Sequence, residues 1–173
     1  MDYENLCLNS KDPFPEIENA VRDNKTVGIL KDLISDRGGE LFATLMYSFQ
    51  QFVCKEKAQQ ISKIIEEISI VEMKHMELLS NAMIQFGGVP VFTNERGEYF
   101  NANYVNYTTN LYEILTTDIK AEKGAVEAYT QAANMVTNES LKNLLLRIRA
   151  DEECHLSVFE KLLREVEFFT KYN

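Results

Sequence analysis

At 173 residues the chain is long enough to bury a full hydrophobic core within one domain, so no second domain is expected. Its formal net charge of −9 argues against polyanionic partners, namely nucleic acid and anionic membrane surfaces. No apolar run is long enough to cross a bilayer, the first residues lack the features of a signal peptide, and the three cysteines are scattered. We therefore expect a cytoplasmic protein with neither a disulfide framework nor a cysteine metal site.

Residues 1–24 are predicted to form an irregular N-terminal arm ahead of one helical domain, residues 25–173. The prolines at positions 13 and 15 impose extended or turn backbone, and the apolar spacing in this stretch is poor. We expect the arm to lie on the helical domain or on a partner subunit.

Residues 25–56 repeat apolar and candidate site residues at alternating intervals of three and four, which predicts a helix. Gly38 and Gly39 fall inside this stretch, and each glycine costs a helix about 1 kcal/mol relative to alanine. Either the helix breaks there or another group approaches closely beside Glu40. We expect the helix to continue unbroken.

The same spacing predicts three more helices, over residues 57–86, 108–136 and 139–169. Gly87 and Gly88, followed by Pro90, form a strong stop signal for the first of these. The connection over residues 89–107 has room for a small β-hairpin around residues 94–97. A connection of this length lets the third helix run parallel to the second. The fold expected is all-α, a four-helix bundle with a long crossover between helices 2 and 3.

Both histidines of the chain stand three residues after a glutamate, in the pairs Glu72/His75 and Glu152/His155. On a helix this spacing puts the two side chains about one turn apart on the same face, where both can reach one ion. A single pair is weak evidence, because solvated helix surfaces often carry one. The case for a metal site depends on what precedes each pair.

An internal repeat precedes the two pairs. Glu40 lies 32 residues before Glu72, and Glu122 lies 30 residues before Glu152. Each of these lone glutamates has an aspartate four residues before it, an alanine three residues after it and a tyrosine seven residues after it. Two lone glutamates and two glutamate–histidine pairs on four helices are the ligand set of a dinuclear metal centre. The predicted metal ligands are Glu40, Glu72, His75, Glu122, Glu152 and His155.

The predicted ligands lie on the apolar stripes of their helices, where charged residues are least expected. Four buried carboxylates facing two imidazoles would leave unpaired negative charge, at a cost of several kcal/mol for each uncompensated ion. Two divalent cations would remove this excess. Carboxylate and imidazole ligands without thiolate favour two iron ions, with two manganese ions as the alternative, and therefore redox chemistry rather than hydrolysis.

Tyr47 and Tyr129, at the last position of each repeat, are candidate catalytic residues. They share the stripe of the glutamates, and a role beside the metals weighs about equally with that of an ordinary buried tyrosine. Asp36 and Asp118, at the first position, are candidates to accept the free ring N–H of the ligand histidines, and this role weighs about equally with the alternative. A helix-surface or capping role is the alternative for both aspartates.

At these residues the chain resembles the bacterioferritin, rubrerythrin and manganese catalase group of ferritin-like proteins, over roughly residues 36–169. The resemblance implies a ferritin-like four-helix bundle in which the glutamates of the two pairs, Glu72 and Glu152, bridge both metals. The lone glutamate and the histidine of each repeat then complete the shell of one metal. Rubrerythrins look to have one more glutamate ligand on the third helix, where this chain has Ala125.

The function implied by the resemblance is that of an oxidoreductase acting on hydrogen peroxide or dioxygen at a di-iron or di-manganese centre, in the manner of a ferroxidase or peroxidase. The alternatives are manganese catalase-like dismutation of peroxide and an iron-storage subunit of the bacterioferritin type. Met73 matches the methionine with which bacterioferritins bind haem between subunits, but a methionine there more often only packs, so haem is not expected. We expect a homo-oligomer, most simply a dimer.

Overall fold

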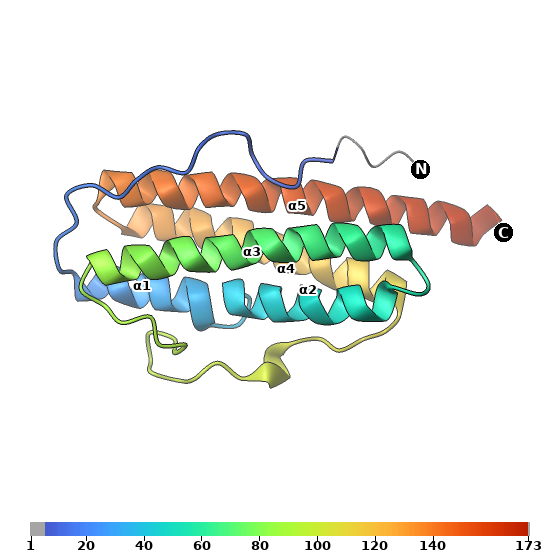
Figure 1. The fold of residues 1–173 in the computed structure, drawn as a ribbon, viewed down its shortest axis with the longest axis horizontal. Helices are drawn as coiled ribbons and strands as arrows, with labels where there is room; N and C mark the ends of the chain where they lie inside the picture. The colour runs from blue at the N-terminus through green and yellow to red at the C-terminus, as the bar shows by residue number, and fades with distance from the viewer. Residues whose placement is uncertain (1–5, 173) are drawn as a thin grey trace.

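The computed structural model describes residues 6–172 of the chain, and the side chains of residues 6–168. Its helices are α1 (Asn24–Ser35), α2 (Glu40–Cys54), α3 (Gln59–Gln85), the short 3₁₀ helix η1 (Ala102–Tyr104), α4 (Leu111–Met135) and α5 (Glu139–Tyr172). Figure 1 shows α1 and α2 as one broken rod, which packs mainly against α3 and also touches α4. Between residues 6 and 172 there is no β-strand and no helix long and apolar enough to cross a membrane. The predicted all-α four-helix bundle is confirmed.

The prediction of one unbroken helix over residues 25–56 is wrong, because the chain turns between α1 and α2. Gly38 adopts a φ of +83°, in the left-handed region that glycine enters at little cost. A Cβ on Gly39 would lie 2.5 Å from the carbonyl oxygen of Leu33, so this position has no room for a side chain. The apolar spacing continues in phase across the turn, and α1 and α2 therefore still lie end to end (Figure 1).

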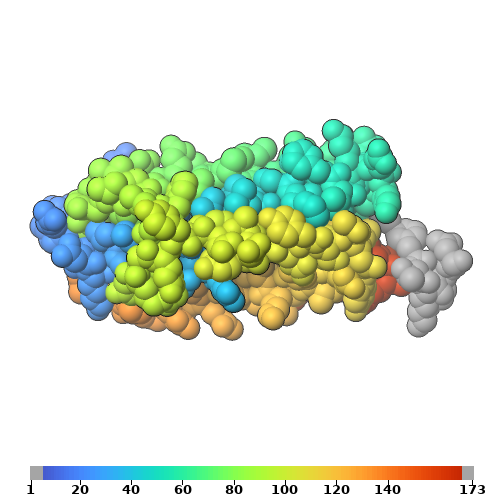
Figure 2. Space-filling model, turned by 90° about the horizontal axis from the view of Figure 1, so that it is seen from below, coloured from blue at the N-terminus to red at the C-terminus, as the bar shows by residue number. Residues whose placement is uncertain are grey.

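The end of α3 and the connection after it follow the prediction in outline. Gly87 has a φ of +84°, and the amide of Gly88 donates to the carbonyl of Met83 at 2.9 Å, which closes the last turn. The connection then runs along the outside of the bundle as the yellow-green band in Figure 2. Its predicted hairpin is reduced to a single antiparallel bridge between Thr93 and Tyr99. Because the connection spans the bundle, α4 runs parallel to α3, as expected (Figure 1).

Two apolar clusters fill the bundle, one towards each end. The first joins α1, the C-terminal halves of α3 and α4 and the start of α5, and it includes Leu30, Leu79 and Leu145. The second joins α2, the N-terminal halves of α3 and α4 and the C-terminal half of α5, and it includes Ile65 and Phe159. Each fully buried side chain of this size contributes about 1.5–3 kcal/mol relative to leaving it exposed. Between the clusters the bundle is polar, because glutamates and histidines interrupt the apolar stripes of α3 and α5.

Residues 6–23 form no regular helix and lie along α5 (Figure 1). The segment is attached to the start of α5 at Glu18, whose amide donates to Ser140 Oγ at 2.8 Å and whose carbonyl accepts from Asn138 Nδ2 at 2.9 Å. Further contacts, described below, bring it over the polar middle of the bundle.

The expectation of unpaired cysteines is wrong, because Cys7 and Cys154 form a disulfide with an S–S distance of 2.07 Å. The two residues are 147 positions apart in the sequence and meet only because the N-terminal segment folds back onto α5. Cys54 is buried and is the free cysteine of the described residues. The disulfide removes the argument from cysteine usage for a reducing compartment, and the cytoplasmic location stays a prediction.

Candidate metal centre

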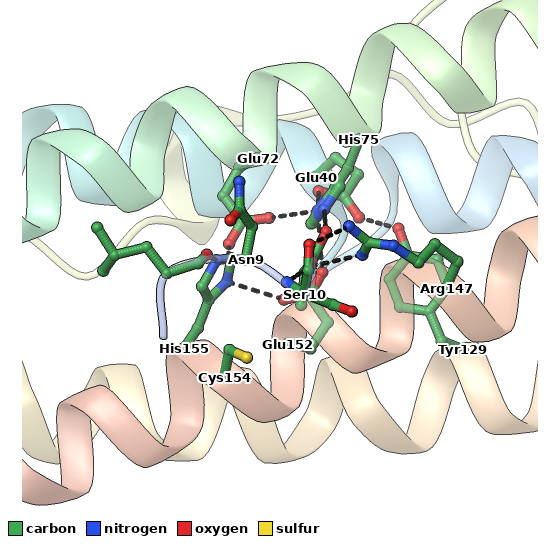
Figure 3. Close-up of polar contacts among 12 residues, drawn as sticks. Asn9, Ser10, Glu40, Glu72, His75, Tyr129, Arg147, Glu152, Cys154 and His155 are labelled. Carbon is green, nitrogen blue, oxygen red and sulfur yellow. Dashed lines mark hydrogen bonds and ion pairs between the residues drawn. The ribbon is translucent and has the colours of Figure 1, made fainter. Parts of the chain in front are cut away.

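All six predicted ligand residues converge in the polar middle of the bundle. Figure 3 shows all of them except Glu122 with labels, pointing toward one another. Each is buried, with at most 4% of its surface exposed. The set consists of Glu40 on α2, Glu72 and His75 on α3, Glu122 on α4, and Glu152 and His155 on α5. Because the glutamate and histidine of each pair are one turn apart, both point inward from the same helix face.

One group of four side chains forms around the inner nitrogen of His75. This Nδ1 atom lies 3.1 Å from Glu72 Oε2, 3.1 Å from Glu152 Oε1 and 3.6 Å from Glu40 Oε2. The four possible ligand atoms of the group lie within 4.8 Å of one another. They come from α2, α3 and α5, so the group exists only in the folded bundle.

A second group of four forms around the inner nitrogen of His155. This Nδ1 atom lies 3.0 Å from Glu72 Oε1, 3.4 Å from Glu152 Oε2 and 3.9 Å from Glu122 Oε2. Glu72 and Glu152 therefore belong to both groups, each with one oxygen towards either histidine. The centroids of the two imidazole rings are 6.1 Å apart. The arrangement has two adjacent positions that share two carboxylates.

The donor set fits two divalent cations. Among the described residues, Glu40 Oε2, Glu72 Oε1, Glu152 Oε1 and His155 Nδ1 are buried without a directed hydrogen bond. A buried carboxylate oxygen without a partner costs free energy unless a proton or a cation compensates it. Oxygen and imidazole donors without thiolate are those that iron and manganese accept.

Without cations, the same side chains must share protons. Burial raises the pKa of Glu40 and of Glu122 well above the ordinary value, and neighbouring carboxylates add to this rise. Burial acts in the same direction on Glu72, but the charges of His155 and His75 outweigh it and lower the pKa of that glutamate. Burial would lower the pKa of both histidines, yet the surrounding carboxylates raise it well above the ordinary value. Protons on Glu40 and Glu122, which we call the outer glutamates, and on the two histidines therefore compensate the negative charge of the site.

The two candidate tyrosines are hydrogen-bonded to the outer glutamates, each across the repeat. The hydroxyl of Tyr47 donates to Glu122, and the hydroxyl of Tyr129 donates to Glu40. Burial, followed by the charge of the neighbouring glutamate, raises the pKa of both tyrosines well above its ordinary value. They therefore stay protonated and orient the carboxylate oxygens that complete each group.

Neither Asp36 nor Asp118 contacts a histidine, so a role as histidine partner is wrong for both, whereas the alternative capping role holds for Asp36 at the C-terminus of α1. Asp118 is buried and accepts a hydrogen bond from Gln50 Nε2 at 2.7 Å. Asp36 lies in the turn after α1, where it accepts a hydrogen bond from Asn94 Nδ2 at 3.5 Å and lies 3.6 Å from Arg96 Nη2. Each lies about one turn before its glutamate, and the other oxygen of Asp118, Oδ2, is buried without a hydrogen bond.

Other groups bind the outer nitrogens of the histidines. His75 Nε2 lies 3.0 Å from Asp151 Oδ2, and His155 Nε2 donates to the main-chain carbonyl of Leu8 at 2.8 Å. Burial would raise the pKa of Asp151, but His75, the Ser10 amide and Arg147 outweigh it and lower the pKa. The signal for Asp151 is its place directly before Glu152 and four residues after a basic residue. The Leu8 carbonyl has no side-chain signal.

The sequence model of the rubrerythrin family matches residues 37–163. This stretch contains all six converging residues and makes up most of the chain. The chain belongs to the rubrerythrin family. The resemblance seen in the sequence repeat is therefore confirmed.

This rubrerythrin-family chain is also similar to individual relatives. It is 23% identical to a "Probable manganese catalase" of Clostridium acetobutylicum, over 95% of this chain and 80% of that protein. Among solved structures it resembles a manganese catalase from Anabaena with a TM-score of 0.83 and 22% identity, over 92% of this chain and 80% of the other. It resembles a Rhodobacter capsulatus bacterioferritin with a TM-score of 0.72 and 21% identity, over 84% of this chain and 87% of the other. These likenesses show the ferritin-like fold.

Ala125 stands where rubrerythrins look to have a further glutamate ligand, and it lines a pocket beside the centre. Ala125 on α4 faces the turn at Gly38 and Gly39 across a small pocket of about 10 Å³, which also touches all four site glutamates. That volume is about what one water molecule needs. A larger outer pocket of about 230 Å³ shares Ala125, both glycines and Glu40 and adds Tyr129. The two pockets are therefore neighbours on the Ala125 side of the site.

Proposed function

We propose that this rubrerythrin-family protein is an oxidoreductase that acts on hydrogen peroxide at a dinuclear iron or manganese centre held by the six converging residues. The observation that carries the proposal is the pair of overlapping groups, in which Glu72 and Glu152 belong to both. One further carboxylate and one imidazole at each position give the donor set of dinuclear carboxylate centres in helix bundles.

When bound, a pair of redox-active ions would exchange two electrons with peroxide, and two electrons with two protons convert one peroxide into two waters. The residues of the chain have three tasks in this proposal. Glu72 and Glu152 keep the two positions adjacent, and the tyrosine hydroxyls hold the outer glutamates. The pocket beside Ala125 has room for about one water molecule, and this size would favour a substrate as small as peroxide.

Two versions of the reaction follow from the two metals. With iron, ferrous ions would be oxidised while peroxide is reduced, and an external donor would restore them. With manganese, one peroxide would be reduced and a second oxidised to dioxygen, so no donor is needed. The similarity to manganese catalases supports the manganese version as the second candidate.

A homodimer is part of the proposal. Phe52, Ile70 and Met73 are exposed on α2 and α3, with 68%, 56% and 43% of their surfaces accessible. Such apolar surface suits a second copy of the chain. Light scattering coupled to size exclusion measures the mass, and a monomer at micromolar concentration would contradict this part. A large shell that takes up far more iron than its centres hold would instead support storage.

The decisive experiment loads the metal-free protein with ferrous iron or with manganese under anaerobic conditions. We expect about two ions per chain by elemental analysis, as this donor set binds, and rapid consumption of added hydrogen peroxide. Oxygen evolution without a reductant would select the manganese version, and stoichiometric ferrous oxidation would select the iron version.

A matched pair of variants tests the site itself. Glu152→Gln removes a carboxylate shared by both positions and should abolish stoichiometric binding and peroxide consumption. Glu153→Gln changes the neighbouring exposed glutamate and should leave both unchanged. Equal metal content in the two variants would refute the assignment of the centre.

A further inference from the structure

The N-terminal segment reaches the candidate metal centre from outside, and its end is bonded covalently to α5. Cys154 directly precedes His155 and is joined to Cys7 by the disulfide. Cys7 is exposed and Cys154 is half-buried, so a small thiol can reach the bond. Figure 3 shows Cys154 outside the cluster of glutamates and histidines. The disulfide is therefore beside the centre and not part of it.

The segment that follows the first cysteine contacts the outer side of both histidines. The Leu8 carbonyl accepts a hydrogen bond from His155 Nε2 at 2.8 Å. The Ser10 amide donates to Asp151 Oδ1 at 2.5 Å, and the other oxygen of Asp151 lies 3.0 Å from His75 Nε2. The inner nitrogens of both rings face the glutamates, so these outer contacts set how the rings are oriented.

Arg147 on α5 binds the same segment. Its Nη2 donates to the Ser10 carbonyl at 2.7 Å and its Nε donates to the Asp12 carbonyl at 2.5 Å. Its guanidinium lies 4.2 Å from the centre of the Phe14 ring. The segment forms no regular helix, so these contacts, the bonds of Glu18 and the packing of its apolar side chains hold it noncovalently, and the disulfide adds a covalent tether.

We propose that Cys7 and Cys154 form a thiol–disulfide switch that controls how firmly the N-terminal segment orients the two histidines. The inference rests on the proposed function, because hydrogen peroxide is the oxidant. One thiol gives up its proton as its sulfur attacks a peroxide oxygen and the O–O bond breaks, which leaves a sulfenic acid and a hydroxide that takes this proton as water. The second sulfur then attacks the sulfenic sulfur, and its proton leaves with the hydroxyl group as a second water. The two sulfurs lose two electrons and the peroxide gains them. A dithiol reductant reverses the change by exchange and is itself oxidised.

The two states differ in what the histidines contact. In the oxidised protein the tether keeps the Leu8 carbonyl on His155 and the Ser10 amide on Asp151. In the reduced protein only noncovalent contacts hold the segment, so it detaches more often and both outer contacts are lost together. Loss of such partners weakens metal binding by about 10–100-fold. Peroxide thus tightens the centre that consumes it.

The test compares oxidised and reduced wild-type protein with Cys7→Ser. Cys54→Ser is the matched control, because Cys54 is outside the disulfide. Hydrogen exchange of the Ser10 amide in the metal-free protein reports detachment of the segment. Transfer of Mn²⁺ from the loaded protein to a chelator reports the effect on the centre.

We expect reduction and Cys7→Ser to accelerate exchange of the Ser10 amide, and to accelerate Mn²⁺ transfer by about tenfold or more, the lower bound for a histidine that loses its hydrogen-bond partner. Oxidised Cys54→Ser should match oxidised wild type in both. Added peroxide should restore the slow rates in reduced wild type and not in Cys7→Ser.

Equal exchange rates in oxidised and reduced protein would overturn the switch. Faster exchange with unchanged Mn²⁺ transfer would also overturn it, since the segment would then not act on the histidines. If no form binds Mn²⁺ or Fe²⁺, the proposed function fails. If the Ser10 amide still exchanges faster in the reduced protein, the disulfide then controls attachment of the segment but no metal centre.

Discussion

Replacing Gly39 by alanine should destabilise the protein, although alanine is the better helix former. The new Cβ would lie 2.5 Å from the Leu33 carbonyl oxygen and 3.0 Å from the Asp32 carbonyl oxygen, and neither backbone atom can rotate away. Overpacking of this kind costs about 1–3 kcal/mol. The smaller entropy of the unfolded alanine variant offsets about 0.4–1 kcal/mol. The net loss expected is about 1–2 kcal/mol, and Glu40, the next residue, should move with the start of α2.

Gly124→Ala is the matched control, because this glycine lies inside α4 with nothing within 4 Å of the added Cβ. It should stabilise the protein by about 1 kcal/mol. Urea unfolding of the metal-free variants, followed by circular dichroism, should therefore separate them by about 2–3 kcal/mol. In thermal unfolding the difference is about 4–12 °C for a chain of this size. If Gly39→Ala proves as stable as Gly124→Ala, the close approach at the helix break does not exist.

Three more predictions concern the centre. The metal-free protein should lose stability as pH rises from about 6 to 9, because folding raises the pKa of both histidines and of Glu40. Protons on these groups stabilise the folded state at low pH, and this contribution is lost as pH rises above the pKa values of the unfolded chain. Added Mn²⁺ should raise the melting temperature more at high pH, and a melting temperature of the metal-free protein that rises over this range would contradict the assignment. Tyr47→Phe should cost the metal-free protein about 1–3 kcal/mol in urea unfolding while leaving the metal stoichiometry unchanged, so loss of one ion would show that the hydroxyl does more than orient Glu122. Asp151→Asn should weaken Mn²⁺ binding about 10–100-fold in competition with a chelator, and wild-type affinity would show that His75 does not need this carboxylate.

The six converging residues could be predicted from the sequence because helix geometry is local. The period of the apolar stripe fixes which face a residue occupies, and the Glu72/His75 spacing repeats at Glu152/His155. Because the pattern occurs twice and lies on the apolar stripes of four helices, the helices have few ways to pack, and the bundle brings all six residues together.

The groups behind the histidines could not be predicted in the same way. Asp36 and Asp118 have the right chemistry, but where they point depends on turns and neighbours that the helix period does not describe. The partner of His155 is the Leu8 main-chain carbonyl, which any residue type would supply. The prediction of one unbroken helix failed for a related reason. The apolar period continues in phase through Gly38 and Gly39, and only the positive φ of Gly38 and the close backbone contact at Gly39 reveal the turn.

Neither half of the chain holds a complete centre, and this constrains how the protein could have arisen. The group on α2 and α3 is completed by Glu152 from α5, and Tyr129 on α4 reaches back to Glu40. An ancestor with one copy of the repeat would therefore assemble a full centre only as a symmetric pair of chains. The crossover between α3 and α4 joins such a pair into one polypeptide and frees its copies to diverge. Only the second copy has an aspartate, Asp151, before its paired glutamate; the first has Val71 there.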